Sequence, residues 1–351
     1  MALTLKTPSW LKAPAWMRGG PAAGRSPRSW LEPRYPSVAF DIDMKALAAV
    51  RIGRRKGESY IASFDVEDVP PDLIEMDFMR WKAADPERFR ALVRRLVEKD
   101  PQKFNRASVI IPDNYARVAL LPFEEMPRNR RDALELIRWK TKKTVPFRVE
   151  EAAVDYQVVK GAAGWTALAV LTPRSVVEEV ETLFEPFGVH AGLVDLSSLS
   201  LINLYRPVFE REGRDSTEFL LANVSGTYFS FAILRRGEIV FFRSKPLAVG
   251  TGDDGGEGSL RLLRRELQTS LVYYREKLEG KGLSRVYLRV VDHDPGPVAS
   301  IFSGEVELGP VSLIDPRRVI STNGRFSGDH GERLLQRLAP ALGATMGRAS
   351  R

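Results

Sequence analysis

The sequence has 351 residues, 44% of them hydrophobic, with a formal net charge of +8 and no cysteine. This length and composition are typical of a globular protein of about two domains. The lack of cysteine excludes disulfides, thiolate nucleophiles and cysteine-ligated metal centres, and the three scattered histidines form no local metal motif. Neither a membrane-spanning run of about 18 apolar residues nor the apolar core of a signal peptide is present, so we expect a soluble protein.

The first 36 residues differ from the rest of the chain. They carry six Lys or Arg residues against one Glu, together with six prolines and three of the six tryptophans. Prolines at this spacing prevent a long helix, so residues 1–36 predict a flexible arm. The arm is either a disordered leader or a segment whose tryptophans and cations contact lipid headgroups or a partner. The rest of the chain is nearly balanced in charge, which argues against a nucleic-acid-binding protein.

A pattern of three strands, a helix and a strand occurs twice. Apolar runs predict the strands, and apolar residues at helical spacing predict the helices, the first of which begins at Pro86 after an N-cap at Asp85. The first copy covers residues 37–43, 45–52, 59–66, 86–97 and 107–111, and the second covers 218–224, 227–234, 238–243, 259–279 and 284–291. This duplication is the outline of the actin-like, ribonuclease-H-like fold, whose two halves face each other across a nucleotide. In that fold the first hairpin tip of each half contacts phosphate through its turn amides, and the equivalent tips here are residues 41–45 and 223–227.

The residues between the two copies predict an insert of mixed α and β structure. Its pattern gives a strand at 116–121, an amphipathic helix at 129–144, a hairpin of 154–159 and 165–171, a helix opened by Pro173 and a further strand. The first of these helices is rich in Lys and Arg. It is either a solvated basic face or a docking surface for an anionic partner or membrane.

The predicted fold class is α/β, with duplicated actin-like domains and an inserted α+β subdomain. The segments are the arm at 1–36, a first actin-like domain at 37–115 plus 196–214, the insert at 116–195, and a second actin-like domain at 215–351. The chain is short between the third strand of the second copy and the following helix. We therefore expect that the helical subdomain around residues 250–283 is reduced.

Four segments resemble the PilM family of type IV pilus assembly proteins, which are actin-like and related to the division protein FtsA. The segments are LPFEEMP at 121–127, TVPFRVEEAAVDY at 144–156, FGVHAGLVD at 187–195 and LRRELQTSLVYY at 263–274. They occur in the order found in the family and span most of residues 37–345. The resemblance implies a cytoplasmic protein that is peripheral to the inner membrane.

The phosphate hairpins of the family read D-I-G, and both differ here. The first reads Asp41-Ile-Asp-Met44, and the second reads Asn223-Val-Ser225, although Gly226 and Thr227 follow it and could serve one residue later. Aspartate in place of glycine brings a carboxylate toward a phosphate position and prevents close approach of the backbone. Two further glycine elements of the nucleotide site are also missing. The resemblance therefore implies degenerate phosphate hairpins, formed by Asp41, Asp43, Met44, Lys45, Asn223, Ser225, Gly226 and Thr227.

These substitutions predict that no cofactor is required and leave no residue to assign a catalytic role. Weak binding of ATP with Mg²⁺ is the alternative. Asp41 matches the magnesium-positioning aspartate of the family, and it is either that metal ligand or a carboxylate that caps a strand end. The sequence Asp292-His-Asp294 is interpreted as a surface turn rather than a metal site.

The resemblance also implies partners. The cytoplasmic tail of a PilN-like bitopic protein would lie as an extended peptide in a groove between the first domain and the insert. Further implied partners are pilus platform proteins and secretion ATPases, with membrane association through these partners and the N-terminal arm. Nucleic acid is not expected, and a homo-oligomer is left open. The candidate residues for the peptide groove are Val118, Leu120, Phe147, Val154, Tyr156 and Val158.

We therefore expect a non-enzymatic scaffold of a type IV pilus or related assembly platform. The alternatives are an ATP-binding PilM-type protein, an actin-fold ATPase or a sugar kinase, each of which would need working phosphate hairpins. A further alternative is the cytoplasmic domain of a type II secretion platform protein. The lack of a membrane-spanning segment disfavours that last alternative.

Overall fold

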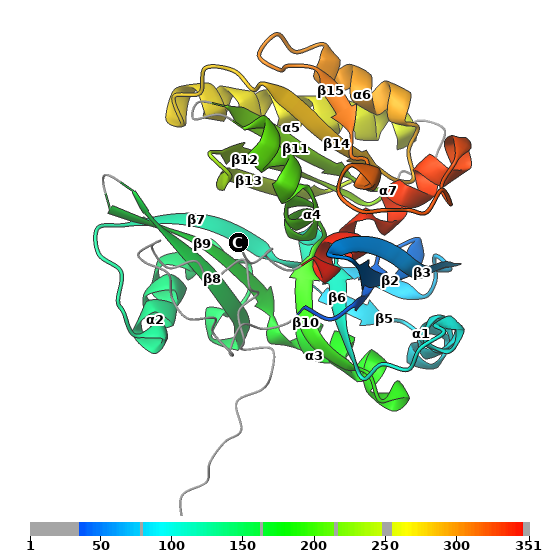
Figure 1. Cartoon of the computed structure of the whole chain (residues 1–351). Coiled ribbons are helices and arrows are strands. Elements are labelled where there is room, and N and C mark those ends of the chain that lie inside the picture. Colours follow the sequence, from blue (N-terminus) through cyan, green and yellow to red (C-terminus); the bar gives the residue numbers. More distant parts are fainter. Residues whose placement is uncertain (1–34, 78–79, 162–163, 214–216, 248–254, 347–351) are drawn as a thin grey trace, which may run out of the picture.

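The structure is a computed structural model that describes residues 35–77, 80–161, 164–213, 217–247 and 255–346. Of the predicted arm, only residues 35 and 36 lie within these ranges. No helix among the described residues is long and apolar enough to span a membrane. The described chain forms two lobes and an insert, shown in Figure 1.

The first lobe is a five-stranded sheet between two pairs of helices. Its strand order is β10-β6-β1-β2-β3, in which β1, β2 and β3 are antiparallel and β6 and β10 run parallel to β1. Helices α1 and α3 pack together on one face, and α4 and α7 pack together on the other (Figure 1). The bounds are β1 Val38–Ile42, β2 Ala46–Arg55, β3 Glu58–Asp68, β6 Arg106–Ile111, β10 His190–Leu196, α1 Pro86–Lys99, α3 Arg174–Phe184, α4 Ser197–Glu212 and α7 Gly328–Thr345. A small hairpin of β4 Ile74–Asp77 and β5 Arg80–Ala83 lies beside α3.

The second lobe repeats this sheet, with the strand order β13-β12-β11-β14-β15. Helix α5 packs on the sheet through a row of leucines that joins a separate apolar core, and α6 lies beside it. The bounds are β11 Glu218–Val224, β12 Tyr228–Arg235, β13 Glu238–Pro246, β14 Arg285–Val290, β15 Val311–Leu313, α5 Gly255–Lys277 and α6 Pro295–Ser303. The predicted duplication is confirmed, because both lobes contain three antiparallel strands, a helix and a parallel strand in the same order.

Local features of the sequence predict the start and the buried face of α1 correctly. Asp85 caps α1 by accepting a hydrogen bond from the backbone amide of Arg88 at 3.1 Å, and Pro86 is the first helical residue. Proline is tolerated there because the first amides of a helix have no internal partner. The apolar spacing of the helix then buries one face against the sheet, through Phe89, Leu92, Val93 and Leu96.

The insert is a three-stranded antiparallel sheet with a helix on one face. The strand order is β7-β9-β8, with β7 Arg117–Phe123, β8 Ala152–Gly161 and β9 Gly164–Pro173, and the helix is α2 Arg130–Thr141. Asn129 caps α2 through a hydrogen bond from the backbone amide of Arg131 at 2.9 Å. The face toward α2 has its own small apolar core, and the opposite face packs toward the lobes.

The structure corrects one sequence-based assignment. Residues 174–195 are predicted in the insert, but β10 pairs with β6 and α3 packs on α1, so both belong to the first lobe. Where a reduced helical subdomain is expected around residues 250–283, the described residues form the single helix α5 on the sheet of its own lobe. Asp292-His-Asp294 lies outside any helix or strand, as predicted, and Asp294 caps α6 by accepting a hydrogen bond from the Gly296 amide.

Candidate functional site

The two predicted phosphate hairpins meet where the lobes face each other. The hydroxyl of Ser225 donates to both carboxylate oxygens of Asp43, at 3.2 and 3.1 Å. A Cβ added at Gly226 would lie 3.1 Å from Nζ of Lys45, so the ammonium group of this lysine lies against the second tip. Side chains of the first hairpin therefore occupy the space between the two tips.

The remaining hairpin residues make contacts that fix the tips in place. The backbone amide of Met44 donates to the Asp43 carboxylate at 2.6 Å, and the Met44 sulfur accepts from the hydroxyl of Tyr115 at 3.4 Å. The carbonyl of Thr227 accepts from the amide of Leu247 at 2.8 Å. Met44 and Thr227 are buried, whereas Lys45 of the first tip is exposed and Gly226 of the second is half-buried.

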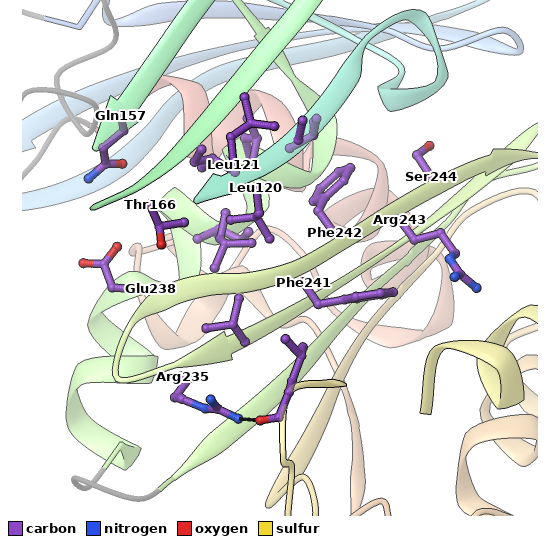
Figure 2. Close-up of a pocket in the computed structure, with 18 of the residues that line it drawn as sticks. Leu120, Leu121, Gln157, Thr166, Arg235, Glu238, Phe241, Phe242, Arg243 and Ser244 are labelled. Carbon is purple, nitrogen blue, oxygen red and sulfur yellow. Dashed lines mark hydrogen bonds between the residues drawn. The ribbon is translucent and has the colours of Figure 1, made fainter. Parts of the chain in front are cut away.

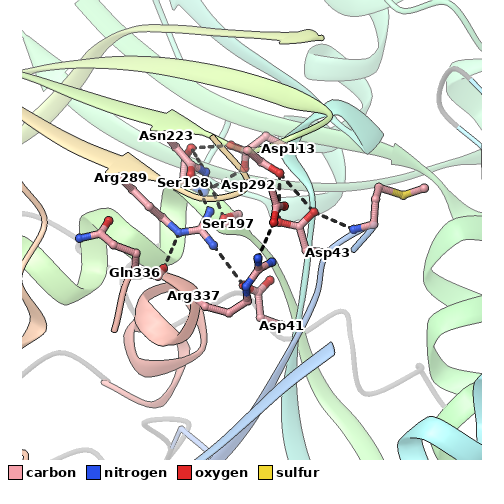
Figure 3. A network of polar contacts seen from close by, with 12 residues as sticks. Asp41, Asp43, Asp113, Ser197, Ser198, Asn223, Arg289, Asp292, Gln336 and Arg337 are labelled. Atoms are coloured by element: carbon pink, nitrogen blue, oxygen red, sulfur yellow. Dashed lines mark hydrogen bonds and ion pairs between the residues drawn. The ribbon is translucent and has the colours of Figure 1, made fainter. Parts of the chain in front are cut away.

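Arg289 lies at the centre of the contact between the lobes (Figure 3). It extends from β14, where the parallel register places it directly beside Asn223 of β11. Its guanidinium donates to Oδ1 of Asn223 and to the backbone carbonyl of Gln336, both at 2.8 Å. It also forms an ion pair with Asp41 of the first lobe at 3.8 Å, and both side chains are almost completely buried.

Burial raises the pKa of Asp41 to about 7, and the Arg289 guanidinium offsets part of that rise. Removing a carboxylate from water disfavours its charged form, whereas a neighbouring cation favours it. Asp41 therefore gains and loses its proton near neutral pH, and the Arg289 guanidinium favours the charged form.

A second set of polar groups lies on the first-lobe side of Asn223. Asp113, which follows β6, accepts hydrogen bonds from the amide and the hydroxyl of Ser198 at the start of α4. The amide nitrogen of Asn223 donates to the hydroxyls of Ser197 and Ser198, each at 3.1 Å. Burial raises the pKa of Asp113. The carboxyl ends of β1, β6, β10, β11 and β14 thus converge on one polar cluster.

The loop after β14 closes the cluster on its other side. Asp292 adopts a left-handed backbone conformation with a φ of 62°, which is uncommon outside glycine. Its carboxylate forms an ion pair with Arg337 of α7 at 2.5 Å (Figure 3). His293 contacts the backbone carbonyl of Ser225 at 3.2 Å, and burial lowers the pKa of this histidine. No group of three or more Asp, Glu or His residues able to hold a metal occurs in the part of the chain that the structure describes.

The residues predicted to line the peptide groove fall on opposite faces of the insert sheet. Val118 and Leu120 of β7 point away from α2 and pack with the large core of the first lobe. The other four residues pack in or against the small core that the sheet forms with α2, and they are Phe147, Val154, Tyr156 and Val158. The six side chains therefore cannot form a single wall.

A groove of about 920 Å³ lies on the lobe-facing side of the insert (Figure 2). Strands β7 and β9 form one wall, β13 and α5 of the second lobe form the other, and α4 contributes the floor. Leu120 of β7 and Phe242 of β13 both line it. Of the predicted peptide-binding residues, this groove includes only Val118 and Leu120.

The sequence analysis did not single out Arg289, Asp113 or Arg337. The sequence does contain one signal for Arg289, because it is the only charged residue in the apolar run 286–291 of a predicted strand. A charge at such a position requires a partner. The other two residues gave none, since they come from distant segments that only the fold brings together.

Comparison with known proteins gives a family and a fold. The model of the type IV pilus assembly protein PilM family matches residues 39–251, which is more than half of the chain. No curated protein sequence matches.

Among solved structures, a PilM–PilN type IV pilus biogenesis complex aligns with a TM-score of 0.73 and 17% identity, over 89% of this chain and 98% of that chain. A Bacteroides thetaiotaomicron protein with an actin-like ATPase fold and unknown function aligns with a TM-score of 0.48 and 12% identity, over 82% and 93% of the two chains. The cytoplasmic domain of EpsL, an inner membrane component of the type II secretion system of Vibrio cholerae, aligns with a TM-score of 0.43 and 10% identity, over 87% and 94%. The chain has an actin-like ATPase fold and belongs to the type IV pilus assembly protein PilM family.

Proposed function

We propose that this protein is a scaffold of a type IV pilus assembly platform, which binds the extended cytoplasmic tail of a PilN-like protein without using ATP. Family membership and the likeness to a PilM–PilN complex support the choice of partner. In this proposal the protein acts in the cytoplasm beside the inner membrane and links the PilN-like protein to cytoplasmic motor components. It catalyses no reaction of its own.

The contact between the two hairpin tips carries the proposal that ATP is not used. A nucleotide phosphate between the tips would break the hydrogen bonds from Ser225 to Asp43. It would also require the ammonium group of Lys45 to move from its place beside Gly226. It would also place phosphate oxygens beside the Asp43 carboxylate, and like charges at this separation repel each other. The residues present therefore do not fit Mg²⁺-ATP, and we treat the cluster as a structural contact between the lobes.

We place the PilN-like tail along β8. This strand pairs only with β9 among the described residues, and it contacts α3, so it borders the first lobe. Tyr156 and Val158 are half-buried on the α2 side of this strand, and Phe147 packs near them. Extended peptides add to free strand edges through main-chain hydrogen bonds and place alternate side chains in neighbouring pockets.

Fluorescence anisotropy with a labelled PilN-like tail peptide tests the proposal. We expect the unmodified protein to bind this peptide and Tyr156→Asp to weaken binding by about tenfold or more, because a charge replaces an apolar contact. Leu120→Glu is the matched control, since it places a similar charge on the opposite face of the same sheet. Val158→Lys gives a second test if Tyr156→Asp does not fold. No binding by the unmodified protein, or equal binding by both β8 variants, would overturn the proposal.

A further inference from the structure

Positive charge is concentrated in residues 128–148, which contain α2. This segment has eight Lys or Arg residues against two acidic residues, a net charge of +6. Residues 37–351 as a whole carry only +3, because the arm holds +5 of the +8, so the rest of that range is net negative. Helix α2 covers the face of the insert sheet that is turned away from the second lobe (Figure 1). The outer side of the insert is therefore strongly basic.

Some of these cations hold α2 on the insert sheet. Arg130 forms an ion pair with Asp155 of β8 at 2.8 Å, and the ammonium nitrogen of Lys140 lies 4.3 Å from the centre of the Phe123 ring of β7. Both contacts join the helix to a strand beneath it. These two cations therefore have a role within the insert itself.

Other cations of the segment have no such role. Arg128, Arg131 and Lys143 are exposed and form no ion pair with any residue that the structure describes. Lys142 is exposed too, and its partner at 3.2 Å, Glu150, is also at the surface. Exposed pairs of this kind are weak, so a stronger anion could compete for this lysine. The outer side of α2 therefore presents four cations to whatever approaches it.

A tryptophan lies among these cations. Trp139 is 74% exposed, and it is the only large hydrophobic side chain exposed among the described residues of this segment. Lys142 and Lys143 follow it by three and four residues, so their side chains are its neighbours on the helical surface. Tryptophan normally buries most of its ring. An indole surrounded by cations is typical of a helix that lies on an anionic bilayer, where the ring enters the headgroup region.

A lipid surface fits this arrangement better than an acidic protein does. The core of a protein interface is a contiguous apolar patch, and a single exposed ring does not supply one. A bilayer adapts to a convex helix and needs no complementary shape. The partner proposed above is bitopic and would hold the protein beside a membrane. That nearness to a membrane rests on the proposed function, whereas the exposed ring and the charges do not.

We propose that the outer side of α2 docks on an anionic lipid surface. The residues that make this contact are Arg128, Arg131, Trp139, Lys142 and Lys143. The indole of Trp139 enters the headgroup region, and the cations meet lipid phosphates. Each Lys or Arg near an anionic bilayer adds about fivefold to the affinity, and salt screens this attraction. The contact therefore turns the insert toward the membrane and adds to the attachment that a bitopic partner provides.

Flotation of the full-length protein with lipid vesicles tests the proposal. We expect binding to vesicles of phosphatidylglycerol mixed with phosphatidylcholine, little binding to vesicles of phosphatidylcholine alone, and a loss of binding as salt is raised. Arg131→Glu/Lys143→Glu should weaken binding by about tenfold or more, because it reverses two charges that face the lipid. Trp139→Ser should weaken it by about threefold or more, because no ring enters the headgroup region. All three side chains are exposed, so these variants should fold.

Arg264→Glu/Lys277→Glu is the matched control, since it makes the same change in net charge at two exposed positions of α5. It should keep vesicle binding within about twofold of the unmodified protein. The proposal fails if both kinds of vesicle bind equally, or if the control weakens binding as much as Arg131→Glu/Lys143→Glu does. Undiminished binding by both α2 variants would assign the lipid contact to another part of the chain and would also overturn it.

No binding to either kind of vesicle would overturn the proposal as well, and it would leave an acidic protein as the partner of this surface. The vesicles contain no PilN-like peptide, and the peptide assay through β8 contains no lipid. Either proposal can therefore fail while the other stands.

Discussion

Arg289 places a positive charge in the interior, between the two lobes. Its guanidinium joins Asp41 of the first lobe to Asn223 of the second and to the backbone of α7. A buried charge is costly unless it is paired and hydrogen-bonded, and here each of its three nitrogens has a partner. The residue therefore holds together groups that would otherwise be buried without compensation.

Arg289→Met should destabilise the protein strongly. The substitution keeps much of the side-chain volume but leaves the Asp41 carboxylate and the Asn223 carbonyl oxygen buried and unpaired. Removing one partner of a buried ion pair typically costs about 3–5 kcal/mol. Urea unfolding at neutral pH, followed by circular dichroism, measures this change in the free energy of unfolding.

Arg285→Met on the same strand is the control for that measurement. Arg285 is more exposed, lies 3.6 Å from Glu212 and donates to the hydroxyl of Ser312 at 3.0 Å. Exposed pairs of this kind contribute about 0–1 kcal/mol. If Arg289→Met cost no more than Arg285→Met, the cluster would not hold the lobes together.

The packing of α7 on α4 depends on Gly343. A Cβ added at this position would lie 1.9 Å from the carbonyl oxygen of Ser200, on the neighbouring helix. The two helices together cover one face of the first sheet, and α7 also supplies Arg337 and the Gln336 carbonyl to the polar cluster. Close approach of these helices therefore links the sheet to the contact between the lobes.

Gly343→Ala should destabilise the protein by about 1–3 kcal/mol or more, because the helices must separate to make room for the methyl group. Gly258→Ala in α5 is the matched control, since no atom lies within 4 Å of its added Cβ. Alanine in an open helical position is favoured over glycine by about 0.5–1 kcal/mol. The midpoint of thermal unfolding should fall for Gly343→Ala and rise for Gly258→Ala. A rise for both would show that the two helices are not tightly packed.

Elements defined by local chemistry could be predicted from the sequence. The cap and first turn of α1 and the two β-β-β-α-β copies follow from apolar spacing and from the residues that flank each element. The partner of a strand could not be predicted in the same way. β10 was assigned to the insert because it follows α3 in the chain, whereas its apolar pattern fits any buried parallel strand.

The candidate site could be predicted only in part. The two hairpin tips were located by the repeat, and the structure brings them together. The other residues of the polar cluster, Asp113, Arg289 and Arg337, could not be predicted. They are far apart in the sequence and meet only in three dimensions. The sequence also did not predict on which face of the insert sheet each of the six peptide-binding candidates lies. Alternation along a strand separates the two faces but does not show which face is covered.

On the scale of the whole molecule, the structure is two similar lobes joined by one buried and one half-buried ion pair, with an insert that borders both (Figure 1). In an actin-like fold the space between the lobes holds a nucleotide, and here side chains from both lobes meet in it. The insert offers a free strand edge on β8 and a groove on its opposite face. This arrangement supports the proposal that partners, rather than a nucleotide, are what the protein binds.

Isothermal titration of ATP with Mg²⁺ into the purified protein, before and after addition of the PilN-like tail peptide, tests that proposal most directly. We expect clear heat from the peptide and none from ATP in either state, because the Asp43 carboxylate is bonded to Ser225 between the hairpin tips and would repel a phosphate there. Micromolar binding of ATP that is lost in Asp41→Ala would contradict the proposal. It would mean that the hairpin tips open to hold phosphate and that the assembly is controlled by nucleotide.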